Sequence, residues 1–441
     1  MFTYVKLNNY KSLVNFSVNF TGKKGIPKKF ILIYGENGVG KSNFATCFYT
    51  LCETLRTRSI IKYMDLFREQ LVDKNVNSEA FNKILHDNFR STEDIIKGCK
   101  TIGSNENMIL EYGFSINGKK GVYRLETDDK NIVAERLEYV LNKNQTFFFD
   151  INPNDIRINK SIFKSSEYEE ELHVLIDKYW GKHSLLSLLI YEIEDKKEGY
   201  LNSKISKGLI EVIAYFMNLF LRVKNGNREE RGKIGESNLK LDDLDSGSII
   251  DNDRNLKELE KTEVFLNSFF TCVYSDVKGV YYKREFVDDK INYQLFFKKL
   301  IFNEILDVSF DKESSGTQNL LEMLPYLLAG VQGHTAVLDE IDTGIHDLLI
   351  ENILENLYDS LVGQIIMTTH NTVLLESSLS KESIYIFTVD RDANKTLLPL
   401  SDYEDRIHPN LNIRKRYLKG LYGGIPSSMD VDFNELLDIM K

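Results

Sequence analysis

A glycine-rich octapeptide carries the strongest chemical signal in this sequence. Residues 35–42 read GENGVGKS and fit the pattern G-x-x-x-x-G-K-S. The stretch follows the continuous apolar run Phe30–Tyr34 and precedes a helix expected at 43–55. Between a strand and a helix, this pattern turns backbone N–H groups toward phosphate oxygens, so it predicts a nucleotide-binding loop. The predicted ATP-binding residues are Gly35, Asn37, Gly38, Val39, Gly40, Lys41, Ser42 and Asn43.

Two side chains of this loop are expected to have specific roles. Lys41 would place its charge on the β- and γ-phosphates of ATP, and the Ser42 hydroxyl would ligate Mg²⁺. The alternative is a glycine-rich turn without a ligand, which would not require a strand on one side and a helix on the other. ATP and Mg²⁺ are therefore the predicted cofactors.

A pair of adjacent carboxylates follows a second short apolar strand, expected at Ala336–Leu338. Asp339 would hold Mg²⁺ directly or through water, and Glu340 would orient and polarise the attacking water. A strand that ends in Asp-Glu is common by chance. This interpretation therefore depends on the phosphate-binding loop being present in the same chain.

Two further patterns are weaker. His370 follows a strand expected at 364–367 and could donate to a γ-phosphate, or it could be an ordinary surface histidine. The segment SSGTQ at 314–318 opens a helix, where serine and threonine are common N-caps, although a helix start with free N–H groups also attracts anions. These alternatives remain open for the residues taken singly.

The surrounding elements read as a mixed α/β chain. Strands are expected at Phe2–Leu7 and Leu13–Phe20, and a hairpin with a longer loop at 117–121 lies between 108 and 127. The most apolar stretch falls within a helix expected at Ile205–Val223. Further strands are expected at 145–151, 279–287, 291–297, 304–310 and 384–389, with helices at Glu167–Tyr179 and 345–357.

This pattern divides the chain into three predicted regions. Residues 1–155 form an N-terminal lobe with the phosphate-binding loop and a β subdomain, and residues 271–441 form a C-terminal lobe with the other motifs. Between them, 156–270 reads as a helical insertion with an acidic loop. Within 235–263, nine acidic residues oppose four basic ones, which predicts a solvated loop.

Composition restricts the partners. The net charge is −10 and hydrophobic residues make up 42% of the chain, which is typical of globular proteins and excludes a uniformly basic coat for DNA. A basic run at Arg414, Lys415, Arg416 and Lys419 could contact nucleic acid or form a solvated stripe. No apolar run is long enough for a bilayer, and the N-terminus lacks a signal-peptide pattern, so we expect a cytoplasmic protein without a membrane partner.

The order of the four motifs resembles that of ABC-type ATPase heads, in particular the RecF/SMC/OLD-like branch. The N-terminal LNNYKSLVNFSVNF is similar to the start of these heads, and SSGTQ is similar to their L-S-G-G-Q signature, with Thr317 in place of the second glycine. DEIDTGIH at 339–346 and QIIMTTHNTVLL at 364–375 are similar to the corresponding segments of this branch. The tail at 412–426 resembles that of bacterial abortive-infection ATPases of the AbiL and PARIS types. The segments between these motifs lack the long coiled coils of SMC proteins, and we expect no Toprim nuclease domain of the kind that OLD proteins carry.

The resemblance implies an α/β fold: an ABC-type P-loop ATPase head with an N-terminal antiparallel β subdomain and a helical insertion. In such families two heads enclose ATP, each supplying its signature to the other. Lys41, Ser42, Asp339, Glu340 and His370 would then act within one chain, with Glu340 and His370 as the catalytic pair. Ser315, Gly316 and Thr317 would act in trans, and Asp342 would lie in the D-loop at the interface. Gln145 is the candidate for the family's Mg²⁺-binding Q-loop glutamine, although the sequence favours an ordinary glutamine at a strand start.

These implications lead to a functional hypothesis. We expect an ATPase that forms head-to-tail homodimers and serves as the sensor of an anti-phage system, controlling a separate nuclease or toxin. The same head would also suit a RecF-like DNA-repair clamp. A third alternative is an ATP-gated scaffold in which nucleotide binding matters more than turnover.

Overall fold

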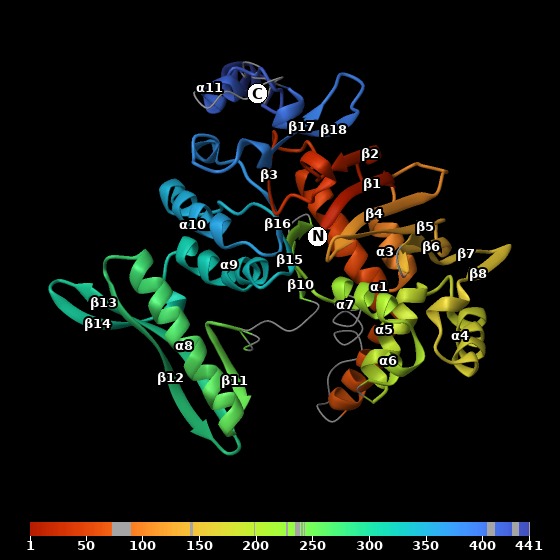
Figure 1. The fold of residues 1–441 in the computed structure, drawn as a ribbon. Coiled ribbons are helices and arrows are strands. Elements are labelled where there is room, and N and C mark those ends of the chain that lie inside the picture. Colours follow the sequence, from red (N-terminus) through yellow and green to blue (C-terminus); the bar gives the residue numbers. More distant parts are fainter. Residues whose placement is uncertain are drawn as a thin grey trace.

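The computed structural model describes residues 1–72, 90–141, 144–197, 199–225, 228–233, 239, 241, 243–403, 411–425 and 432–440. A central sheet in the order β10-β9-β15-β16-β3-β17-β18 organises the fold (Figure 1). Its inner strands β9, β15, β16, β3 and β17 are parallel, and the two edge strands are antiparallel. The strands are β10 (Arg228–Lys233), β9 (Leu219–Asn225), β15 (Thr335–Leu338), β16 (Gln364–Thr368), β3 (Phe30–Tyr34), β17 (Ile384–Val389) and β18 (Lys395–Pro399).

Both faces of this sheet are buried, which explains why its strands are continuous apolar runs. On β3, Ile31 and Ile33 belong to one hydrophobic core, while Phe30, Leu32 and Tyr34 belong to a second core on the opposite face. Helix α1 (Lys41–Val72) contributes to the first core. Helices α9 (Ser315–Val331) and α10 (Asp347–Ser360) contribute to the second. The result is a layered α/β fold in which helices cover both faces.

The first core is closed by an antiparallel sheet in the order β2-β1-β4-β5-β6-β7-β8. Here the predicted longer loop between β4 and β5 is wrong. The connection is the two-residue turn Asn117-Gly118, with φ of 51° and 78°, which suits the tight type I′ hairpin. The strands are β1 (Phe2–Tyr10), β2 (Leu13–Asn19), β4 (Met108–Ile116), β5 (Lys119–Thr127), β6 (Ile132–Leu141), β7 (Asn144–Asn152) and β8 (Asp155–Ile158).

The expected helix at Ile205–Val223 is also corrected. Helix α7 (Lys207–Met217) ends at Asn218, and β9 begins at Leu219 as a strand parallel to β15. The run is apolar because it is buried in the sheet. The segment predicted as a helical insertion therefore supplies β9 and β10 to the central sheet. Its helices are α4 (Ser166–Tyr179), α5 (Leu185–Asp195), α6 (Tyr200–Lys204), α7 and most of α8 (Asp253–Val273).

A third sheet lies on the side of the second core. It has the order β11-β13-β12, with β14 also pairing with β13, and α8 (Asp253–Val273) packs on β12. This unit projects to one side of the central sheet (Figure 1). Much of the predicted acidic loop is thus ordered in β11 and α8, while residues 235–238, 240 and 242 lie outside the described residues. The strands are β11 (Ser246–Ile250), β12 (Val277–Val287), β13 (Lys290–Ile301) and β14 (Glu304–Ser309).

The C-terminal segments are short helices, α11 (Ile413–Leu418) and α12 (Phe433–Ile439). Ile413 and Tyr417 of α11 are buried in the second core. In the part of the chain that the structure describes, no helix has the length and apolar character needed to cross a bilayer.

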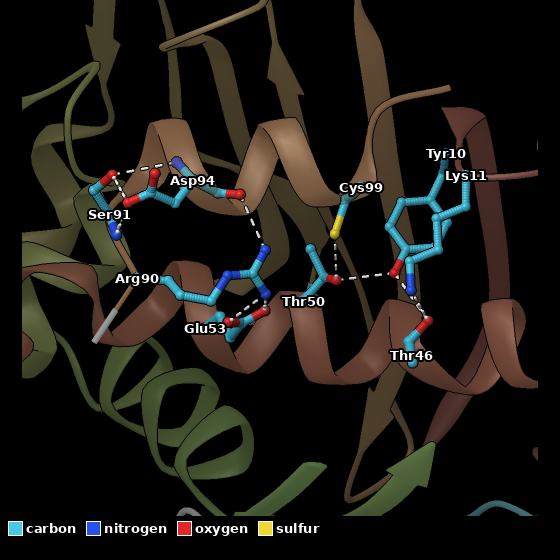
Figure 2. A network of polar contacts seen from close by, with 9 residues as sticks. All are labelled: Tyr10, Lys11, Thr46, Thr50, Glu53, Arg90, Ser91, Asp94 and Cys99. Atoms are coloured by element: carbon cyan, nitrogen blue, oxygen red, sulfur yellow. Dashed lines mark hydrogen bonds and ion pairs between the residues drawn. The ribbon is translucent and has the colours of Figure 1, made fainter. Parts of the chain in front are cut away.

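Polar contacts along α1 fix the helix that begins at the nucleotide-binding loop (Figure 2). The Tyr10 hydroxyl, at the end of β1, lies 2.9 Å from Thr50 Oγ1 and donates to Thr46 Oγ1 at 3.3 Å. Thr50 Oγ1 also lies 3.3 Å from Cys99 Sγ in α3 (Thr92–Cys99). Farther along the helix, Arg90 donates to Glu53 Oε1 at 3.0 Å. Together these contacts tie α1 to the antiparallel sheet and to α3.

We predict that Tyr10→Phe lowers the free energy of unfolding by about 1 kcal/mol. The substitution removes a fully buried hydroxyl together with its hydrogen bonds, while the aromatic ring remains. Urea denaturation measures the change. Tyr358→Phe on α10 is the matched control, since Tyr358 contributes its ring to a contact with Phe30. Equal stability of the two variants would contradict the role assigned to the Tyr10 hydroxyl.

Candidate nucleotide-binding site

The glycine-rich loop joins the end of β3 to the start of α1, as predicted. Gly38 and Gly40 have φ of +79° and +117°, where side chains other than glycine are strained. Gly35 is required for another reason, because a Cβ on it would lie 2.9 Å from Phe387 Cβ in β17. Val39 is buried in the first core, whereas Asn37 is exposed at the tip of the loop.

Lys41 lies at the centre of the loop. Its Nζ donates to the carbonyl oxygens of Gly35 at 2.7 Å and Glu36 at 2.9 Å. Burial lowers the pKa of Lys41 to about 8, although the carboxylates of Asp339 and Glu340 oppose the shift. A glycine-rich loop between a strand and a helix, with a buried ammonium at its centre, fits the phosphates of a nucleotide. Asn43 instead donates to Ser12 Oγ at 2.7 Å, so it anchors α1 to the β1–β2 turn.

Asp339 follows β15 and is buried beside Ser42. Burial raises the pKa of Asp339, while hydrogen bonds from the Thr368 and Ser42 hydroxyls act in the opposite direction. The backbone N–H of Lys224 also donates to Asp339 Oδ2 at 3.3 Å. A carboxylate and a hydroxyl in contact offer oxygen ligands, which Mg²⁺ prefers. The pair therefore fits the predicted metal site.

Glu340 has an unusual backbone. Its φ is +53°, which is uncommon for a residue other than glycine and recurs at functional sites. Its N–H donates to Thr368 Oγ1 at 2.9 Å, and its carbonyl accepts a hydrogen bond from Thr343 Oγ1 at 3.1 Å. These contacts hold the carboxylate-bearing residue at the end of β15, next to Asp339.

His370 and Asp342 meet near the same edge of the sheet. The His370 N–H donates to Asp342 Oδ2 at 3.3 Å. Partial desolvation and the charge of Lys41 lower the pKa of His370, although Asp342, Glu340 and Asp339 oppose this. The structure thus brings the predicted His370 and Asp342 into the electrostatic field of Lys41.

The predicted signature segment begins α9, with Ser314 as the N-cap accepting a hydrogen bond from the Thr317 N–H at 3.2 Å. Ser315 is exposed. A Cβ on Gly316 would lie 2.1 Å from the Gly344 carbonyl oxygen, so only glycine allows α9 to approach the 340–346 loop. Thr317, in the place of the second signature glycine, lies 2.9 Å from Ser314 through their hydroxyls. Among the described residues, no recorded hydrogen bond joins this segment to the nucleotide-binding loop of its own chain.

The prediction that Gln145 ligates Mg²⁺ is not supported by its position. Gln145 is exposed on β7, where its Nε2 donates to Glu138 Oε2 at 3.1 Å. Asn43, just after the nucleotide-binding loop, contacts Ser12 in the β1–β2 turn, and β7 is five strand positions from β2. At about 4.8 Å per strand, this is roughly 24 Å along the sheet.

Sequence reasoning missed two cations on β9. Lys224 forms an ion pair with Glu340, and Arg222 Nη2 donates to Asn319 Oδ1 at 2.6 Å and Glu322 Oε2 at 3.0 Å in α9. With the adjacent strand ends, they line a cavity of about 200 Å³. The sequence does hold a signal for this strand. Asn218 is a poor helix former, and a short apolar run of strand length follows it.

Most of the chain is similar in sequence to a known protein family. Residues 30–376 match the family described as "AAA domain, putative AbiEii toxin, Type IV TA system". The chain belongs to this AAA family. The match spans both the nucleotide-binding loop and the Asp-Glu strand. No curated protein matches the sequence.

Solved structures similar to this AAA-family chain include heads of SMC proteins. One is an SmcHead bound to the C-winged helix domain of ScpA, with 15% identity and a TM-score of 0.47, covering 91% of this chain and 99% of the other. Another is the SMC head domain from Thermotoga maritima, with 14% identity and a TM-score of 0.38, covering 90% and 98%.

The predicted fold class is confirmed. The central sheet, with its nucleotide-binding loop between β3 and α1, is that of an α/β ABC-type P-loop ATPase head. The N-terminal antiparallel sheet and the helices α4–α7 correspond to the predicted β subdomain and helical insertion.

We predict that ATP affinity falls above pH 8, where Lys41 begins to lose the proton that phosphates require. The decline should approach about tenfold per pH unit, since binding must then restore the proton. Isothermal titration between pH 7.5 and 9 measures this change, and two buffers of different ionisation enthalpy report proton uptake. Lys41→Met should bind weakly without this pH dependence. A constant wild-type affinity across this range would contradict the prediction.

Proposed function

We propose that this protein is the ATP-binding and ATP-hydrolysing subunit of a bacterial anti-phage, abortive-infection system. The observation that carries the ATPase proposal is the meeting of Lys41, Asp339 and Glu340 at one edge of the central sheet. The family description, with its toxin context, supports the defence role. The protein would act as an ATP-driven sensor or scaffold that controls a separate effector.

The side chains have distinct tasks in this proposal. Lys41 binds the β- and γ-phosphates, while Ser42 and Asp339 hold Mg²⁺, which neutralises phosphate charge when bound. Glu340 orients the attacking water and accepts its proton. His370 donates a hydrogen bond to the terminal phosphate. Hydrolysis then converts ATP and water to ADP and phosphate.

The proposed active form is a head-to-tail homodimer. Helix α9 begins with Ser315, Gly316 and Thr317, and Ser315 is exposed in its first turn. The N-terminal turn of a helix attracts phosphate. Within one chain this turn packs on the loop at 340–346. We therefore assign it to the nucleotide of a second copy, with Asp342 at the interface.

We propose that the C-terminal tail links the ATP site to a partner protein. A Cβ on Gly424 would lie 3.5 Å from the Gly35 Cα in the nucleotide-binding loop. Tyr417 in α11 stacks edge-on against Tyr34 at 5.8 Å and donates to the Gly424 carbonyl at 2.7 Å. The tail, which resembles that of abortive-infection ATPases of the AbiL and PARIS types, thus packs against the nucleotide-binding loop, and nucleotide binding would move it.

The predicted nucleic-acid contact at the basic run has less support. Arg414 forms an ion pair with Glu376 at 2.9 Å and donates to Thr372 Oγ1 at 3.2 Å. Lys415 and Lys419 remain exposed. One cation of the run is thus engaged with a neighbouring carboxylate, and we propose a protein effector on the strength of the family description.

We predict that Glu340→Gln retains ATP binding but lowers kcat by about 100-fold or more, because the amide cannot accept a proton from water. The variant should accumulate as an ATP-bound dimer, measured by light scattering after size exclusion. Glu304→Gln on β14 is the matched control and should behave as wild type. Turnover by Glu340→Gln near the wild-type rate would contradict the assigned base.

The effector is sought by purifying tagged Glu340→Gln protein from its native host with ATP, followed by mass spectrometry. A stoichiometric nuclease or toxin would support the defence proposal. Recovery of DNA and replication proteins without such a partner would favour the RecF-like clamp.

A further inference from the structure

Lys224 contacts the side chain that the proposed hydrolysis depends on. Its ammonium pairs with Glu340 Oε2, and both side chains are partly exposed, at 37% and 32%. The backbone N–H of Lys224 also donates to Asp339. Lys224 therefore contacts both members of the carboxylate pair from a strand that is separate from both motifs.

The strand order shows toward which side the ion pair draws the Glu340 carboxylate. β9 and β16 flank β15 on opposite sides, and β3, which leads into the nucleotide-binding loop, lies beyond β16. An ion pair with Lys224 thus draws the Glu340 carboxylate toward β9, on the side away from the nucleotide-binding loop.

We propose that Lys224 is a positioning residue that holds Glu340 in a resting orientation. This inference rests on the proposed function, because it assumes that Glu340 is the base. Release of the ion pair allows the carboxylate to turn toward the nucleotide. The cavity of about 200 Å³ between β9, β15 and α9 gives the two side chains room to separate.

The same strand connects this ion pair to the signature helix. Arg222, two residues before Lys224, is buried and bonds to Asn319 and Glu322 of α9. Asn319 in turn donates to the Thr343 carbonyl at 2.6 Å, in the loop that follows Glu340. A second copy that engages the start of α9 would act on Asn319, which contacts both Arg222 on β9 and the loop that follows Glu340. Dimer formation is therefore the event that releases Glu340.

The test compares Lys224→Met, Lys224→Arg and wild type in steady-state ATP hydrolysis. At a low protein concentration, where only part of the protein is dimeric, turnover per chain of Lys224→Met should exceed that of wild type by about twofold to fivefold, because dimer formation no longer has to break a partly exposed ion pair. KM should not change. At high concentration, where dimers form, the two activities should converge. Lys224→Arg should retain the wild-type profile because it preserves the pair, and Lys257→Met on exposed α8 is the matched control.

A second comparison shows whether the effect passes through Glu340. In the Glu340→Gln background, Lys224→Met should change neither residual turnover nor ATP affinity. If wild type hydrolyses ATP and Lys224→Met is equal or slower at low concentration, the inference is overturned while the proposed function stands. If neither protein hydrolyses ATP, the proposed function fails and the inference fails with it.

Discussion

The hydroxyl of Thr368 joins the ends of two neighbouring parallel strands. It donates to Asp339 Oδ1 and accepts a hydrogen bond from the Glu340 N–H. One side chain thereby fixes Asp339, the proposed metal-binding carboxylate, and the backbone of Glu340, the proposed catalytic residue. It also offsets the cost of the left-handed conformation of Glu340. The Thr368 hydroxyl accepts a hydrogen bond from the Glu340 N–H, which would otherwise have no acceptor in the β15–β16 ladder.

The remaining architecture keeps that junction aligned with the nucleotide-binding loop. Parallel strands place their carboxyl ends at the same edge, so β3, β15 and β16 deliver Lys41, Asp339 and His370 together. Apolar layers on both faces of the sheet prevent the strands from shifting. The polar contacts along α1 and the tail that packs against Gly35 hold the loop from two further directions.

Much of this site could be predicted because each motif is local. The strand Phe30–Tyr34, the glycines and Lys41 are contiguous, and the Asp-Glu pair directly follows its strand. Lys224 and Gln145 depend on tertiary pairing instead. The run around Lys224 is apolar enough for either a buried helix or a buried strand, and only its parallel pairing with β15 decides between them. The role of Gln145 was predicted from a family pattern alone, and the strand order separates this residue from the nucleotide-binding loop.

The central claim is that each nucleotide site is completed by a second copy. Mixing Lys41→Ala with Ser315→Arg tests it most directly, since each variant alone lacks one half of every site. Ser315 is exposed, so the arginine can be accommodated without disturbing the core. In a head-to-tail dimer, the mixed pair contains one intact nucleotide-binding loop facing one intact signature. We expect ATP hydrolysis to reappear on mixing. A mixture as inactive as its components, with mixed dimers present, would contradict the account.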